Sequence, residues 1–164
     1  MSESTGKVDP RIIVLSGGVG AERDVSLKSG QSLADALESV GQVDLIDLVE
    51  TTLPPEMDPR SQVVFPIIHG TFGEDGTLQS LLDEAGFAYA GCDSKSSRLC
   101  MHKGKSKDLV SEAGVRVARD IRFLEPREVS AEDTVEELGN DLVVKPVDQG
   151  SSVALHICRG AKEL

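Results

Sequence analysis

Two glycine-rich segments in the first half of the chain each carry a polar side chain that could bind a ligand. Gly17-Gly18-Val19-Gly20 follows an apolar run and leads to the carboxylate of Glu22, and a second segment runs from His69 to Gly76. Backbone N–H groups in such loops can bind an anion, a carboxylate can bind an ammonium, and a histidine can donate to a carboxylate. Taken singly, Glu22 also suits a helix start and His69 a structural role. Two such loops in one sheet favour a pocket.

The second half of the chain offers lysines and a Gly-Ser-Ser turn. Lys103 lies near the start of a predicted helix, and Lys145 ends an apolar run shortly before Gly150-Ser151-Ser152. Ammonium groups, backbone N–H groups and hydroxyls all suit phosphate oxygens. The segment is not a Walker A loop, and the first glycine segment is not a G-x-G-x-x-G fingerprint. Lys105 and Lys107 are interpreted as a solvated helix face, whereas for Lys103 and Lys145 solvation and phosphate binding remain equally open.

Hydrophobic periodicity predicts alternating strands and helices in the first part of the chain. We predict a helix that stops at Gly41, a loop over 51–59, a helix over 77–85, and strands over 12–15, 43–48, 63–68 and 87–89. This order is typical of an α/β fold with a parallel sheet. Pro66 is awkward in a strand because it cannot donate a ladder hydrogen bond. Such sheets bind ligands beyond the carboxyl ends of their strands, which is where Glu22 and His69 fall.

The pattern changes near residues 95–100, where we place a domain boundary. Beyond it we predict helices over 96–113 and 134–138, and strands over 115–123, 142–145 and 153–158. This part mixes helices and strands.

Composition excludes several classes of function. The 164 residues carry a formal net charge of 17 − 28 = −11, which argues against a nucleic-acid partner because no excess of Lys and Arg is available for phosphates. No apolar run reaches the length of a membrane span, and the polar segment Met1–Pro10 is not a signal peptide. The three cysteines include no C-x-x-C pair. We therefore expect a reduced, cytoplasmic protein without a membrane partner.

In this order, the segments resemble those of the D-alanine–D-alanine ligases of the ATP-grasp class. The family segment G-G-x-x-x-E-R-E-V-S-L-x-S-G corresponds to residues 17–30, with Asp24 in place of Glu. The family segment H-G-x-x-G-E-D-G-x-x-Q matches residues 69–79 at every fixed position. A helix start M-D-K corresponds to residues 101–103, and K-P-x-x-x-G-S-S to residues 145–152. The resemblance covers nearly the whole chain from residue 11 onward.

The resemblance implies an ATP-dependent ligase for peptidoglycan precursor synthesis. ATP would phosphorylate the carboxylate of one D-alanine, and the amine of a second would attack the acyl phosphate to give D-alanyl-D-alanine. Glu22 would hold the ammonium of the first D-alanine, and His69 would lie near its carboxylate. Val25 and Gly70 would also belong to the substrate-binding residues. Ser151 would join Glu22 in a hydrogen-bonded network that shapes the catalytic site.

The ATP site implied by the resemblance uses the second half of the chain. Lys103 and Lys145 would bind ATP phosphates, and Gly150, Ser151 and Ser152 would cover them. In the family, the magnesium ligands, the adenine-binding segment and an arginine at the transferred phosphoryl group belong to a later half. We therefore expect no metal ligand in these residues, and we expect the chain alone to be catalytically incomplete.

The resemblance also implies the domain organisation. Residues 1–97 would form a Rossmann-like, pre-ATP-grasp amino-terminal domain through which the family dimerises. Residues 98–164 would form the beginning of the ATP-grasp ATP-binding subdomain, an α+β unit truncated at its end. The expected partners are D-alanine, ATP and a second copy of the chain.

Three departures from the family pattern lie near the phosphate-binding residues. His102 replaces the usual Asp before Lys103, which bears on how that helix start is held. Gln149 and Ala154 replace Glu and Gly around the Gly-Ser-Ser turn, which bears on the closed geometry of the loop.

Two alternative functions remain open beside the ligase interpretation. The chain could be a non-catalytic dimerising or binding module derived from the ligase amino-terminal domain. It could also come from a D-alanyl-D-lactate ligase, whose distinguishing residues would lie in the later half. Another ATP-grasp enzyme of the biotin-carboxylase type is disfavoured by the intact segment from His69 to Gln79.

Overall fold

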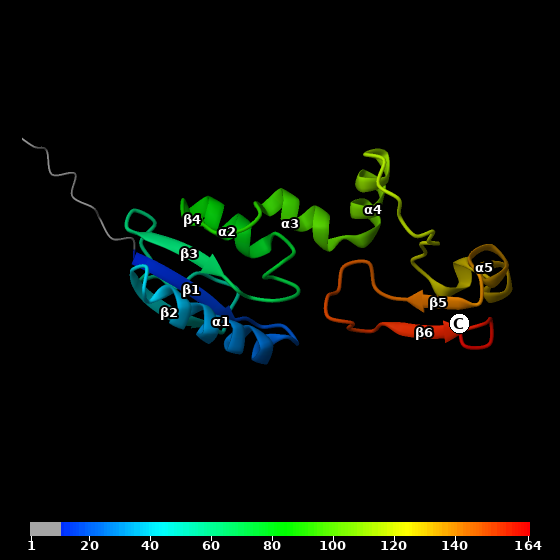
Figure 1. Ribbon diagram of the computed structural model, residues 1–164, viewed down its shortest axis with the longest axis horizontal. Helices are drawn as coiled ribbons and strands as arrows, with labels where there is room; N and C mark the ends of the chain where they lie inside the picture. The colour runs from blue at the N-terminus through cyan, green and yellow to red at the C-terminus, as the bar shows by residue number, and fades with distance from the viewer. Residues whose placement is uncertain (1–10) are drawn as a thin grey trace, which may run out of the picture. The chain divides into compact units, whose positions relative to one another are not determined.

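The computed structural model describes residues 11–164 and divides into two compact units (Figure 1). The first unit ends at Arg98, and the second runs from Leu99 to Leu164. The interpretation of Met1–Pro10 as a segment other than a signal peptide lies outside the described residues. The assignment of residues 1–97 and 98–164 to the two family domains stays a prediction.

The first unit is an α/β fold built on a parallel sheet, as predicted. Its elements are β1 (Arg11–Gly17), α1 (Arg23–Leu37), β2 (Gln42–Leu48), β3 (Gln62–Pro66), α2 (Thr77–Ala85), β4 (Ala88–Tyr89) and α3 (Ser94–Met101), within which the division between the units falls. The strands lie in the order β2-β1-β3-β4. Figure 1 shows α1 and α2 on opposite faces of this sheet.

β1 is the buried centre of the first unit. Its four apolar residues, Ile12 to Leu15, are at most 1% exposed. Leu15 packs in a cluster with Leu78 of α2, and Val14 packs in a cluster with Ala34 of α1. Because helices cover both faces, the strand has apolar side chains on both sides and is a continuous apolar run in the sequence.

Several predicted boundaries shift in the first unit. α1 ends at Leu37, and a turn closes before Gly41, whose N–H donates to the Leu37 carbonyl. β3 ends at Pro66, two residues earlier than predicted. The neighbouring strand β4 pairs with β3 only at Val63 and Val64. Pro66 lies beyond this pairing, so its lack of an N–H costs no hydrogen bond to β4. The helix predicted over 77–85 is confirmed as α2.

The second unit contains short elements. They are α4 (Lys103–Glu112), the 3₁₀ helix η1 (Pro126–Glu128), α5 (Ala131–Leu138), β5 (Asp141–Val144) and β6 (His156–Arg159). β5 and β6 form an antiparallel pair in which Leu142 faces Cys158. Across residues 11–164, no helix has the length and apolar character needed to span a membrane.

Three predictions for the second unit are wrong in part or in whole. The single helix predicted over 96–113 is two helices, α3 and α4, because His102 between them has extended backbone angles. Residues 115–123 form no strand, and ion pairs to α4 hold this segment. The strand predicted from residue 153 begins at His156, because the residues before it form a left-handed turn.

Candidate functional site

The carboxylate of Glu22 lies where the two glycine-rich loops of the first unit meet. Glu22 is the N-cap residue of α1, yet its side chain makes no capping hydrogen bond. A Cβ on Gly70 would lie 2.5 Å from Glu22 Oε2, so only glycine at this position leaves room for the carboxylate. Glu22 Oε1 is buried and has no hydrogen-bond partner within residues 11–164. A buried carboxylate oxygen without a donor is costly, which favours a cationic ligand group as its partner.

Arg23 and Ser26, both inside the first motif, fix the loop that carries Glu22. Arg23 pairs with Asp47 at 2.6 Å and donates to the carbonyl oxygen of Gly18 at 3.2 Å. Ser26 is fully buried; its Oγ accepts from the N–H of Gly17 at 2.9 Å and donates to the carbonyl of Ile67 at 2.7 Å. The hydroxyl thus joins the end of β1 to the residue after β3. Sequence reasoning missed both roles, although both residues belong to the quoted motif.

His69 lies at the start of the second loop, between two polar side chains. Its Nε2 is 3.3 Å from Ser29 Oγ, and its Nδ1 is 3.6 Å from Glu74 Oε1. The other oxygen of Glu74 accepts from the N–H of Gly70 at 2.8 Å. The two glycine-rich loops of the first unit therefore form one polar region that contains Glu22 and His69. Val25, the other expected substrate-binding residue, is 58% exposed on α1.

Asp75 closes the second loop onto α2. Its two carboxylate oxygens accept from the N–H groups of Phe72 and Thr77, both at 2.9 Å. Burial alone would raise the pKa of Asp75, but these hydrogen bonds and the charge of Arg98 outweigh it, so the pKa lies below its usual value. The loop is tight enough that a Cβ on Gly73 would lie 2.1 Å from the Ile68 carbonyl oxygen. The loop geometry therefore requires glycine at position 73.

The second unit brings together all five residues expected to bind ATP. They line a pocket of about 300 Å³ whose wall consists of Cys100, Met101, Lys103, Lys145, Gln149, Gly150, Ser151, Ser152, Val153 and Leu155. The only charged residues in this wall are the two lysines. The pocket is therefore suited to an anion, although the chain as a whole is strongly acidic.

Lys103 is held against the Gly150–Ser152 loop by its backbone and by its side chain. Its backbone N–H donates to the Val147 carbonyl at 2.8 Å, and its Nζ donates to the Gln149 carbonyl. His102 directly before it is the N-cap of α4, and its Nδ1 accepts from the N–H of Lys105 at 3.2 Å. The His102 side chain therefore caps the helix, as a carboxylate commonly does.

Comparisons with known proteins find relatives along nearly the whole chain. Residues 47–92 match the family model described as D-ala D-ala ligase N-terminus. The D-alanine–D-alanine ligase of Glaesserella parasuis is 37% identical over 155 residues, which is 94% of this chain and 51% of that protein. The ligase of Thermotoga petrophila is 39% identical over 159 residues, which is 93% of this chain and 49% of that protein.

Solved structures extend the match to the fold. The Bacillus anthracis D-alanine–D-alanine ligase complexed with ATP matches with a TM-score of 0.76 at 29% identity, over 94% of this chain and 52% of that chain. This chain matches the amino-terminal half of the D-alanine–D-alanine ligases. The D-alanyl-alanine synthetase A of Vibrio cholerae has a TM-score of 0.81 at 23% identity, over 94% of this chain and 53% of that chain, which shows the fold alone. The chain spans about half the length of these relatives.

The departures from the ligase pattern have distinct consequences in the structure. His102 keeps the capping role at α4. Gln149 contributes its backbone carbonyl to Lys103, a contact that does not depend on its side chain. Ala154 has φ 51°, and Ser151 and Ser152 have φ 45° and 61°. Such left-handed angles cost a non-glycine residue roughly 1–2 kcal/mol. Ala154 is therefore strained at a position where the glycine of the ligase pattern would not be.

The structure assigns the expected site residues to different units. Glu22, His69 and Gly70 belong to the first unit, and Lys103, Lys145 and Ser151 belong to the second. The expected network between Glu22 and Ser151 thus stays a prediction of the ligase resemblance. Within residues 11–164, no group of three His, Cys, Asp or Glu side chains could hold a metal ion.

Proposed function

We propose that this chain forms the amino-terminal part of an ATP-dependent D-alanine–D-alanine ligase. The observation that carries the proposal is the buried, unpartnered Glu22 Oε1 beside Gly70, in a loop that the match to the ligases covers. A free amino acid presents an ammonium that satisfies such an oxygen. The lysine-lined pocket of the second unit supports the ATP-dependent part of the proposal, because lysine ammonium groups bind phosphate oxygens.

In the proposed reaction, the carboxylate of the first D-alanine attacks the γ-phosphorus of ATP, which gives an acyl phosphate and ADP. The amine of the second D-alanine then attacks the acyl carbon, and phosphate leaves. Glu22 holds the first D-alanine by its ammonium, which leaves the carboxylate free to react. Lys103 and Lys145 offset the negative charge of the phosphates, and Ser151 and Ser152 offer further donors. Positioning and charge stabilisation are the main sources of rate in phosphoryl transfer.

Magnesium would accompany ATP in this reaction and neutralise phosphate charge. Within residues 11–164, no group of three His, Cys, Asp or Glu side chains could hold it. We propose that residues 1–164 alone do not make dipeptide. A coupled assay for ADP release on the purified chain checks this, and D-alanine-dependent turnover would contradict it.

Substitution of Glu22 tests the amino-acid site. Glu22→Gln should weaken D-alanine binding by about tenfold or more, the scale for loss of a charge-assisted hydrogen bond. ATP affinity should not change, because Glu22 does not line the lysine pocket. Asp24→Asn is the matched control, since Asp24 is an exposed carboxylate in the same helix. Calorimetry with each ligand separates the outcomes. Equal losses for D-alanine and ATP, or equal effects of the two variants, would remove Glu22 from this role.

Substitution of the lysines tests the phosphate site. Lys103→Met and Lys145→Met should each weaken ATP binding by about tenfold or more, because each removes a charge from the pocket wall. Lys105→Met is the control, since Lys105 is exposed on α4 and outside the pocket. An equal loss in Lys105→Met would show that net charge, and not the pocket, governs the affinity.

A further inference from the structure

α4, which begins at Lys103, has little apolar packing to hold it in place. Gly104 is the one buried residue of this helix, and Leu109 is 50% exposed. Its first turn contains Lys103 and Lys105 and no acidic residue, so its charges oppose the helix dipole. The position of Lys103 must therefore depend on polar contacts to α4.

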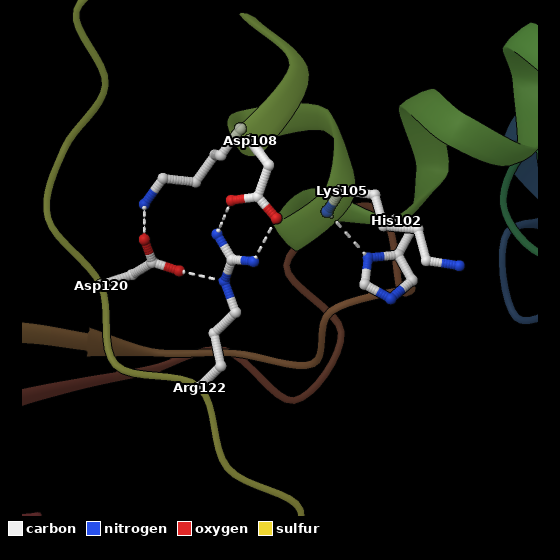
Figure 2. A network of polar contacts seen from close by, with 6 residues as sticks. His102, Lys105, Asp108, Asp120 and Arg122 are labelled. Atoms are coloured by element: carbon white, nitrogen blue, oxygen red, sulfur yellow. Dashed lines mark hydrogen bonds and ion pairs between the residues drawn. The ribbon is translucent and has the colours of Figure 1, made fainter. Parts of the chain in front are cut away.

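Arg122, in the segment wrongly predicted as a strand, makes several of these contacts (Figure 2). Its Nη1 and Nη2 donate to the two oxygens of Asp108 at 2.7 and 2.6 Å, and its Nε donates to Asp120 at 2.7 Å. Lys107 donates to the other oxygen of Asp120 at 2.6 Å. A bidentate pair between a guanidinium and a carboxylate fixes direction as well as distance. These four alternating charges tie the segment to α4.

The guanidinium of Arg122 also lies against the first turn of α4. A Cβ on Gly104 would be 3.1–3.2 Å from the Nη1, Cζ and Nε atoms of Arg122, so any larger residue would have to displace the guanidinium slightly. Gly104 directly follows Lys103, which donates to the carbonyls of Val147 and Gln149. The start of α4 is therefore held both by Arg122 and by the loop that forms the pocket wall.

We propose that Arg122 is a positioning residue for Lys103 and acts through α4. The inference rests on the proposed function, in which Lys103 binds phosphates of ATP. Arg122 does not line the pocket, so its effect on the ligand runs through the helix and not through contact. A lysine at position 122 would keep the charge but would lose the bidentate pair with Asp108. Charge and geometry are therefore separable by mutation.

The test compares Arg122→Met and Arg122→Lys with Arg119→Met in the full chain. Arg119 is exposed in the same segment, and its side chain makes no hydrogen bond or ion pair within the described part of the chain. Hydrogen exchange at the amide of Lys105, which donates to His102, reports the first turn of α4 without any ligand. Calorimetry with ATP and magnesium reports the pocket.

Both Arg122 variants should accelerate exchange at the Lys105 amide about fivefold and weaken ATP binding about fivefold, the scale for an exposed bidentate pair. Arg119→Met should change neither by more than about twofold. Unchanged exchange in Arg122→Met would overturn the proposal. Equal losses of ATP affinity in Arg119→Met and Arg122→Met, with full affinity in Arg122→Lys, would also overturn it, because Arg122 would then act by charge alone.

Asp108→Asn gives a second route if Arg122→Met unfolds the unit. It removes the charge of the bidentate acceptor while Arg122 and its contact with Gly104 remain, so a smaller change in the same direction supports the proposal and no change contradicts it. A parent chain that binds no ATP would overturn the proposed function. The exchange measurements, which need no ligand, would then decide separately whether Arg122 holds Lys103 in place.

Discussion

The two units place their site residues by different physical means. In the first unit, the loops with Glu22 and His69 follow strands of a sheet whose central strand is fully buried. In the second unit, Leu142 and Cys158 are the buried apolar residues, and α4 is held by exposed ion pairs and a histidine cap. The proposed amino-acid site of the first unit therefore rests on packing, whereas the proposed phosphate site of the second unit rests on polar contacts.

This difference indicates which of the two proposed ligand sites is preformed. A packed core opens only at the cost of most of its unit's stability, whereas segments held by exposed polar contacts open locally at low free energy. Ligand binding should therefore order the second unit more than the first. The following predictions test this contrast between the units.

The largest expected effect is on the core of the first unit. Leu15→Ala should lower the free energy of unfolding by about 2–5 kcal/mol, the range for a truncated buried leucine. Leu15 is completely buried in β1, whereas Val49, at 64% exposure, gives the control Val49→Ala. Urea unfolding measures the change. A loss below about 1 kcal/mol would contradict the packed-core description of this unit.

The next effect concerns the hydroxyl that joins β1 to the residue after β3. Ser26→Ala should cost about 1–3 kcal/mol, because the N–H of Gly17 and the carbonyl of Ile67 lose their buried partner. D-alanine affinity should fall as well, since the same loop carries Glu22. Ser32→Ala is the control, because Ser32 bonds to the Lys28 carbonyl on an exposed helix face. Equal stability of the two variants would show that the strand ends do not depend on Ser26.

A smaller effect is expected in the loop of the second unit. Ala154→Gly should stabilise the chain by up to about 1 kcal/mol, because glycine adopts φ 51° without strain. Ala113→Gly is the control, since Ala113 has φ −78° and gains nothing from glycine. Denaturant unfolding of the two variants should shift in opposite directions. A destabilised Ala154→Gly variant would mean that the loop is not strained in solution.

The smallest expected effect is a loss of hydrogen-exchange protection in α4 at low pH. Hydrogen bonds from Arg122 lower the pKa of both Asp108 and Asp120 below the usual 3.8. A group with a lowered folded-state pKa stabilises the fold above its unfolded value, and this contribution is lost as the pH falls below it. Protection of the Ser106 amide, which donates to the backbone carbonyl of His102, should therefore be constant just above about pH 4 and decline below it. The same titration in Arg122→Met should show a weaker decline, and identical profiles would exclude the ion pairs as its cause.

The sequence predicted the first unit well because its signals are local. The apolar run from Ile12 to Leu15 and the glycine after Ala85 each identify an element without knowledge of its neighbours. The family pattern also indicated Lys103 and Lys145, which the structure brings into one pocket.

The errors arose where distant contacts decide the local structure. Val115 and Val117 alternate as in a strand, but the ion pairs of Arg122 hold this segment and no strand pairs with it within residues 11–164. The helix that begins after His102 is held by the distant Val147 carbonyl, which accepts from the N–H of Lys103. Long-range contacts of this kind leave no periodic pattern in the sequence.

The bond from the Lys103 ammonium to the Gln149 carbonyl has a kinetic consequence. A lysine ammonium has three N–H donors, and this one uses a single donor on a neutral carbonyl, so its charge and two donors stay available to a phosphate. The carbonyl therefore orients the ammonium before a phosphate arrives, and association needs no prior release of the loop.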